Sequence, residues 1–206
     1  MSAATGLVSL APERLGWRET RRLIGTDLDR IAQHLQVPNS WAHRLYFFCL
    51  PGFQALLFHR ISRCLYLKGW TSLPRMVSLF ALYLTRAEIP PTTSIGPSAL
   101  IAHATCVNVF GKLGARVTIN GCSAIGGGMA MDDIGGGPGY PVIGDDVVLA
   151  YGANVLGPVR IGDGVHVGPG ALVTFDVPDG GLVLWDRPRV IRGGASPTPP
   201  MHQDKT

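Results

Sequence analysis

Residues 143–167 read Ile143-Gly-Asp-Asp-Val-Val-Leu149-Ala-Tyr-Gly-Ala-Asn-Val155-Leu-Gly-Pro-Val-Arg-Ile161-Gly-Asp-Gly-Val-His-Val167, with an aliphatic residue at every sixth position. The same phase runs from Ile95 to Ile125, and each aliphatic residue except Ile125 is followed four positions later by a small or β-branched one. A fixed short period is typical of stacked units that bury their apolar faces only together, and a period of six fits neither a helix nor a long strand. The pattern predicts a coiled β-ribbon with a narrow aliphatic core. It disfavours an evenly stranded β-sandwich, whose turns would recur every ~8–12 residues.

The segment before the coil has the apolar spacing, caps and proline positions of helices. Four helices are expected, over residues 12–36, 40–49, 51–68 and 72–86. We therefore expect a mostly β protein in three parts: a helical N-terminal domain at residues 1–88, the coil at residues 89–192, and a disordered tail at residues 193–206. A glycine-rich stretch at residues 128–141 interrupts the repeat and is expected to leave the coil. Such long irregular segments in compact domains are usually functional or disordered.

Charge and cysteine content exclude several classes of protein. Residues 1–94 hold eleven Lys and Arg against five Asp and Glu, whereas residues 95–206 hold seven against nine. The positive charge is spread over expected helix faces without a basic, aromatic groove, so nucleic acid is not an expected partner. The four cysteines show neither close pairing nor metal-ligand spacing, so we expect reduced thiols, no metal and, with no signal-peptide pattern, a cytoplasmic location.

Two apolar runs, at residues 45–58 and 73–84, are shorter than the ~18–20 residues of a membrane-spanning helix. We expect them to be buried helices or an oligomer contact. Peripheral contact with a membrane surface stays open as the alternative.

The repeat resembles that of the hexapeptide-repeat acyltransferases, and two further segments narrow the resemblance to the serine O-acetyltransferase branch. These segments are Pro51-Gly-Phe-Gln-Ala-Leu56 and Ile101-Ala-His-Ala-Thr-Cys106, and the resemblance extends over residues 12–192. It implies a left-handed parallel β-helix with three hexapeptides per turn. It also implies acetyl-CoA as co-substrate and a homotrimer or dimer of trimers.

Transfer of an acetyl group to a hydroxyl needs a base for the hydroxyl proton, and imidazole suits this role near neutral pH. His103 matches the catalytic histidine of the family. Glu88 lies fifteen residues earlier, where the family has an aspartate that orients the imidazole. The alternatives are a solvated surface histidine and a charged residue at a helix end.

The positions that bind the acceptor in the family differ in this sequence. Ala102 replaces an acid, and Gly139-Tyr140 replaces an Arg-His pair, so both charged anchors for free serine are lost. We expect a small molecule or sugar as acceptor, bound with help from Tyr140, Asp132 and Asp133. L-serine, as in cysteine biosynthesis, stays open as the alternative acceptor.

For the donor, the resemblance implies a groove between coils of neighbouring subunits. Small residues would let the pantetheine approach the backbone at Gly127, Ala153 and Ala171. The phosphates would be bound by three cations, Arg187, Arg189 and Arg192. A protein of another class is also possible, namely a catalytically silent β-helix that serves as a scaffold or regulatory partner.

Overall fold

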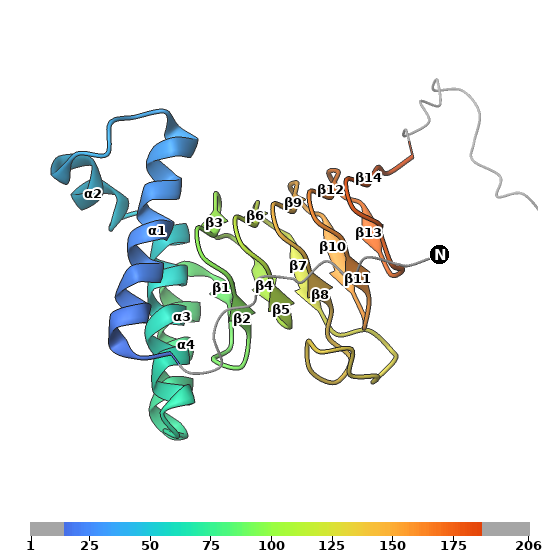
Figure 1. The fold of residues 1–206 in the computed structure, drawn as a ribbon, viewed down its shortest axis with the longest axis horizontal. Coiled ribbons are helices and arrows are strands. Elements are labelled where there is room, and N and C mark those ends of the chain that lie inside the picture. Colours follow the sequence, from blue (N-terminus) through green and yellow to red (C-terminus); the bar gives the residue numbers. More distant parts are fainter. Residues whose placement is uncertain (1–14, 187–206) are drawn as a thin grey trace, which may run out of the picture.

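The computed structural model describes residues 15–186 of the chain (Figure 1). Arg187, Arg189, Arg192 and the expected tail at residues 193–206 lie outside the described residues.

The N-terminal half folds into helices, as the sequence predicts: α1 (Trp17–Leu35), α2 (Trp41–Phe47), α3 (Pro51–Leu67) and α4 (Ser72–Thr85). Local chemistry sets their ends. Ser40 caps α2, since its side chain accepts a hydrogen bond from the amide of His43. Pro51 opens α3, where its missing N–H costs nothing. Arg86 ends α4 by adopting a left-handed conformation.

The remainder winds through three parallel sheets, here called A, B and C. Sheet A contains β1 (Ala87–Glu88), β4 (Val107–Val109), β7 (Ala124–Gly126), β10 (Asn154–Leu156) and β13 (Leu172–Val173). Sheet B contains β2 (Ser94–Ile95), β5 (Lys112–Leu113), β8 (Val142–Ile143) and β11 (Arg160–Ile161). Sheet C contains β3 (Leu100–Ile101), β6 (Thr118–Ile119), β9 (Val148–Leu149), β12 (His166–Val167) and β14 (Leu182–Val183). The chain visits A, B and C in turn, so each circuit is one coil of a parallel β-helix.

The aliphatic residues of the repeat stack inside this coil. Ile95 pairs with Leu113 eighteen residues later, and Ile143 pairs with Ile161 at the same interval. All four side chains are buried and belong to one core. The predicted coil and its aliphatic core are therefore confirmed. On its other side Leu113 pairs with Ile143. This interval is longer than eighteen residues, because the loop at residues 127–141, which contains the expected excursion, lies between the two strands.

The helices gather at one end of the coil, and the strands stack away from them (Figure 1). Ala55 and Leu56 of α3 join the same apolar core as the coil. The coil begins at β1, where Ala87 is buried and pairs with Val107. The left-handed Arg86 turns the chain out of α4 and into β1.

A buried ion pair ties the helices to the first coil. Nε of Arg60 donates to Oδ2 of Asp27 over 3.0 Å, and both side chains are about as buried as the aliphatic core. Arg60 also donates to the carbonyl of Gly96, 2.7 Å away, while Asp27 accepts from the amide of Ala99, 3.0 Å away. These bonds satisfy both charges inside the protein, and they fix α1 and α3 against the turn that precedes β3.

Within residues 15–186 no helix combines the length and the apolar content that crossing a bilayer requires.

Candidate active site

Two edges of the coil carry the residues of interest. The C–A edge is formed by the loops that lead from sheet C to sheet A, at residues 102–106, 120–123, 150–153 and 168–171. The A–B edge is formed by the loops that lead from sheet A to sheet B, including the excursion at residues 127–141. His103 lies on the C–A edge, and Tyr140 lies on the A–B edge.

His103 is exposed and lines a cavity of about 550 Å³ between the helices and the first coil. One wall is β3 with the following residues, and the other walls come from α1, α2 and the first turn of α3. His34 of α1 lines the same cavity. No motif in the sequence indicates this, because α1 is far from His103 in the chain. Among the described lining residues none is Asp, Glu, Lys or Arg, so the two imidazoles and the hydroxyls of Tyr46 and Thr105 are its titratable or polar side-chain groups.

The Pro51-Gly52 pair sets the distance between α3 and His103. A Cβ on Gly52 would lie only 1.9 Å from the carbonyl oxygen of Ile101, two residues before His103. Only glycine therefore lets the helix contact β3 so closely. No side chain caps the start of α3, and Pro51, Gly52 and Phe53 line the cavity. The first-turn amides and the positive end of the helix dipole are thus at the wall of the same cavity as His103.

Tyr151 continues the C–A edge next to His103. Gly121 separates the two side chains, since a Cβ there would lie 3.0 Å from the ring of Tyr151 and 3.2 Å from Cβ of His103. The Tyr151 hydroxyl is 3.1 Å from Sγ of Cys122. This hydrogen bond raises the pKa of Tyr151 above its ordinary value. The sequence did not single out Tyr151, because only the coil places it beside His103.

Glu88 does not contact His103 within the chain. It is exposed on sheet A and lines a different cavity, of about 260 Å³, beside α4. Among the described residues no hydrogen bond or ion pair joins Glu88 to His103, and the two cavities share no residue. The expected pairing of carboxylate and imidazole is therefore not formed within one chain.

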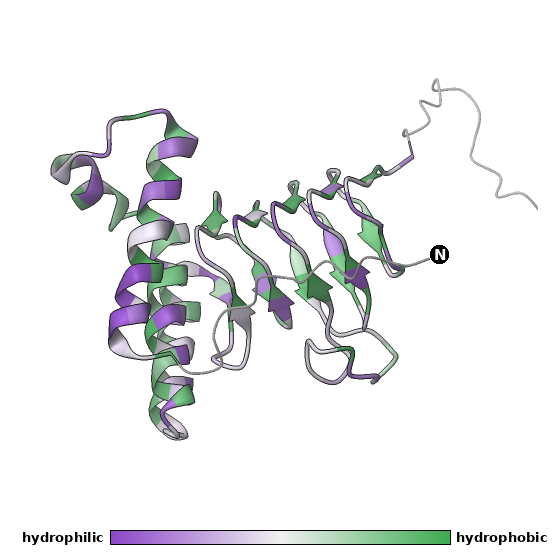
Figure 2. Cartoon of the chain, viewed as in Figure 1, coloured by the Kyte–Doolittle hydropathy of each residue, from purple (hydrophilic) through white to green (hydrophobic). Residues whose placement is uncertain are grey.

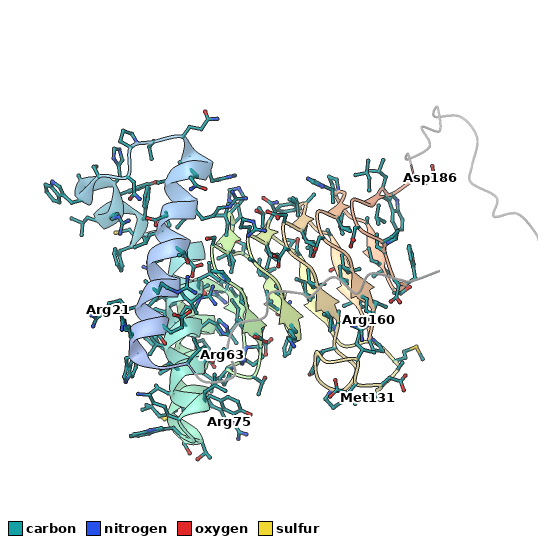
Figure 3. All side chains as sticks on the ribbon, viewed as in Figure 1. Arg21, Arg63, Arg75, Met131, Arg160 and Asp186 are labelled. Atoms are coloured by element: carbon teal, nitrogen blue, oxygen red, sulfur yellow. The ribbon has the colours of Figure 1, made fainter. Side chains whose placement is uncertain are left out.

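The expected acceptor residues gather on the excursion at the A–B edge. The ring of Tyr140 stacks on Phe110 with centroids 5.5 Å apart and planes at 14°. The Asp133 carboxylate accepts from the amides of Gly135 and Gly137 at 2.8 and 3.1 Å, so it shapes the loop. Asp132 is exposed on the same loop. Arg160 extends toward the loop (Figure 3) and donates to the carbonyl of Ile134.

None of these residues lines the cavity that contains His103. Tyr140 instead lines a separate cavity of about 480 Å³, together with Arg63 and Lys112. Within one chain the structure thus keeps the expected acceptor residues and the expected base on different edges of the coil.

The small residues expected along the donor groove also lie on two different edges of the coil. Ala153 and Ala171 lie in adjacent coils of the C–A edge, next to the paired residues Asn154 and Leu172, and both are buried. Gly127 lies on the A–B edge, where a Cβ would be 3.4 Å from the ring of Tyr140.

Comparisons with known proteins agree with this fold. The family model described as bacterial transferase hexapeptide (six repeats) matches residues 140–174. A serine acetyltransferase of Mycobacterium tuberculosis is 36% identical over 155 residues, which cover 74% of this chain and 65% of the relative. One from Bacillus subtilis is 31% identical over 173 residues, covering 82% of this chain and 76% of the relative.

The chain belongs to the serine acetyltransferase family. Soybean serine acetyltransferase, in a structure with serine, aligns with a TM-score of 0.71 and 27% identity over 84% of this chain and 69% of that one. The resemblance inferred from the two sequence segments is confirmed, and the coil is the left-handed parallel β-helix of the family. The chain spans less than two thirds (65%) of the length of the M. tuberculosis relative.

Within residues 15–186 no three side chains of His, Cys, Asp or Glu lie close enough together to hold a metal ion.

Proposed function

We propose that this family member is an acetyl-CoA-dependent O-acetyltransferase in which His103 is the general base. The observation that carries the proposal is the exposed imidazole of His103 in a cavity walled by the first turn of α3. The names of the relatives, serine acetyltransferase, support acetyl transfer as the reaction type.

In this reaction the imidazole of His103 takes the proton of the acceptor hydroxyl as the oxygen attacks the thioester carbonyl carbon. A carbon–oxygen bond forms, and negative charge develops on the carbonyl oxygen. The uncapped first-turn amides of α3 are suited to stabilise that charge. The carbon–sulfur bond then breaks, and the proton on His103 passes to the leaving thiolate of coenzyme A.

The complete site requires more than one chain. His103 lies on the C–A edge, whereas Glu88 and Tyr140 lie on sheet A and the A–B edge. A ring of three copies would repeat one heterologous contact and bring the C–A edge of one chain to the A–B edge of the next. Glu88 of the neighbour would then orient His103, and the neighbour's excursion would close the acceptor cavity. The donor would lie along the C–A edge at Ala153 and Ala171.

L-serine is the acceptor that the relatives favour, since they are named for it and the soybean structure contains it. A specific observation favours a second candidate, a hydroxyl compound without charge. The cavity beside His103 has no carboxylate or cationic side chain among its described lining residues. It therefore lacks, within one chain, the partners that an ammonium and a carboxylate would need.

The test is release of free coenzyme A thiol from acetyl-CoA by the purified full-length chain, measured with L-serine, other amino acids with hydroxyl groups, and uncharged polyols and sugars. Acceptor-dependent release that saturates supports the proposal, and the preferred compound decides between the two acceptor candidates. Absence of release with every acceptor, together with no binding of acetyl-CoA, would favour a catalytically silent scaffold.

A further inference from the structure

The cavity of about 480 Å³ at the A–B edge contains two cations and no counter-charge. Arg63 of α3 and Lys112 of β5 line it together, and among its described lining residues none is Asp or Glu. The other polar side chains of the lining are hydroxyls, from Thr92, Ser94 and Tyr140. The cavity therefore offers positive charge and hydrogen-bond donors.

Arg63 is a buried charge without a carboxylate partner. It is 9% exposed, and it extends from α3 to the first coil (Figure 3), where Nη1 donates to the carbonyls of Pro91 and Thr92 at 3.2 and 3.0 Å. Its Nε has no hydrogen-bond partner among the described residues. Desolvation, reinforced by the charge of Arg60, lowers the pKa of Arg63 below its ordinary value. Carbonyl oxygens accept hydrogen bonds but do not cancel the charge, so an anion nearby would stabilise this side chain.

The coil brings Lys112 to the same place. Lys112 pairs with Ser94 in the preceding coil of sheet B, and Ser94 lies two residues after Thr92, whose carbonyl binds Arg63. Lys112 is half-buried. Among residues 15–186 no carboxylate lies within salt-bridge distance of Arg63 or Lys112. The two charges therefore add to one positive field inside the cavity.

The excursion closes the cavity without neutralising it. Residues 135–138 and Tyr140 form part of the wall. Figure 2 shows most of this loop in pale colours, of intermediate hydropathy. Its carboxylate closest to the wall in the sequence is that of Asp133, which accepts from the amides of Gly135 and Gly137 and is not a lining residue.

A neighbouring copy would not supply the missing charge either. In the ring proposed above, the A–B edge of one chain meets the C–A edge of the next. No Asp or Glu occurs in the four loops of the C–A edge, at residues 102–106, 120–123, 150–153 and 168–171. The counter-charge is thus left to a small anion, whether or not a neighbouring copy covers this edge.

The charge of the cavity selects the kind of anion. A carboxylate carries one negative charge and would neutralise only one of the two cations. A phosphoryl group carries a charge of about −1.5 to −2 at neutral pH, and its oxygens are strong hydrogen-bond acceptors. Arginine and lysine are both common phosphate ligands in proteins. A phosphoryl group therefore matches Arg63 and Lys112 together.

We propose that Arg63 and Lys112 bind a phosphoryl group in the cavity between α3, β5 and the excursion. The ligand is inorganic phosphate or a phosphate monoester of a small molecule. The proposal is independent of acetyl transfer, since it requires neither the acetyl donor nor His103.

The test is calorimetric titration of the full-length protein at constant ionic strength and without acetyl-CoA. The probes are inorganic phosphate, glycerol 3-phosphate and glycerate, a carboxylate of similar size. The expected result is saturable binding of a phosphate compound and weaker binding of glycerate, because glycerate carries less charge. Tighter binding of inorganic phosphate would identify a site for the free anion, and tighter binding of glycerol 3-phosphate a site for an ester. Glycerate binding as tightly as both phosphates would overturn the proposal.

Lys112→Met is expected to weaken phosphate binding by at least about tenfold, since it removes a charge-assisted hydrogen bond to the ligand. Arg21→Met is the matched control, because it removes one positive charge from an exposed side chain of α1 that does not line the cavity (Figure 3). Its affinity should equal that of the parent. Absence of saturable binding of both phosphates would overturn the proposal. Equal affinity of Lys112→Met and the parent would do so too, as would an equal loss in the two variants.

Discussion

Gly52 meets the carbonyl of Ile101 so closely that a Cβ at residue 52 would lie 1.9 Å from that oxygen. No real Cβ contact is so short, and the obstacle is backbone, which cannot rotate away. The contact joins the first turn of α3 to the last residue of β3, immediately before Ala102 and His103. One glycine thereby fixes the wall of the candidate active site.

Gly52→Ala is therefore expected to push α3 away from β3. We expect a loss of stability of about 1–3 kcal/mol from overpacking and a loss of acetyl transfer larger than the loss of folded protein. Gly25→Ala in α1 is the control, because nothing lies within 4 Å of its Cβ position. That change is expected to stabilise the chain by up to about 1 kcal/mol. Chemical unfolding and the coenzyme A release assay measure both effects, and a fully active, stable Gly52→Ala protein would contradict this account.

The fold could be predicted because its determinants are local and periodic. The aliphatic residue at every sixth position, as at Ile95 and Val155, specifies which side chains enter the core, and capping residues such as Ser40 specify where helices begin. The site could be predicted only in part. His103 and Gly52 belong to contiguous motifs, but the buried contact between Asp27 and Arg60 joins residues 33 apart in the chain.

Such contacts form when the helices pack on the coil, and the periodicity of the sequence does not specify how they pack. His34 and Tyr151 were missed for the same reason, since each reaches the neighbourhood of His103 only through tertiary structure. The separation of Glu88 and Tyr140 from His103 also could not be predicted from the sequence, because it depends on which sheet each strand joins.

His103→Ala is expected to lower acetyl transfer by the ~10²–10⁴ typical of a lost general base, while leaving the affinity for acetyl-CoA nearly intact. His166→Ala is the matched control, because His166 is also exposed on the coil but lies away from the cavity. Steady-state kinetics with any accepted acceptor, together with calorimetric titration of acetyl-CoA, separate the two effects. Turnover of His103→Ala at the parent rate would remove His103 from the mechanism.

Mixed oligomers test whether the site is shared between chains. His103→Ala and the charge reversal Glu88→Arg are each expected to be nearly inactive. Refolding the two together in equal amounts would place an intact His103 against an intact Glu88 in about a quarter of random contacts. Activity should therefore rise toward about a quarter of the parent value. Thermal unfolding of each variant verifies its fold. A mixture no more active than its components, formed from folded chains, would show that Glu88 does not act across the contact.

His59 makes stability depend on pH. It is 1% exposed in α3, and both ring nitrogens lack a hydrogen-bond partner among the described residues. Burial, reinforced by the charges of Arg60 and Arg63, holds its pKa well below 6.5. Below about pH 6.5 the unfolded chain binds a proton at this residue and the folded chain does not. The free energy of unfolding should then fall as pH decreases, by at most about 1.4 kcal/mol per pH unit.

Urea unfolding at pH 7.5 and pH 5.5 measures this loss. The His59→Leu variant is expected to lose less stability than the parent over the same interval, whatever its stability at pH 7.5. Equal losses in the two proteins would show that His59 does not contribute.

The acceptor pocket can be altered at one position without straining the backbone. Residue 139 is not that position. The family pattern has arginine there, but the backbone of this chain disfavours arginine at residue 139. Gly139 has φ +75°, and a Cβ there would lie 2.8 Å from the carbonyl oxygen of Ala130. Ala102 is partly exposed and lines the cavity with His103, so it can accept a side chain.

Ala102→Asp places a carboxylate beside His103, where a charge-assisted bond to an ammonium contributes about 1.5–3 kcal/mol. If the acceptor is L-serine, its KM should fall by about tenfold or more. If the acceptor is an uncharged hydroxyl compound, the variant should gain nothing and lose some activity, because the carboxylate is desolvated without a partner. Ala102→Asn is the control, since it has nearly the same shape without the charge. Improved turnover of L-serine by both variants would mean that charge pairing is not the missing element in this pocket.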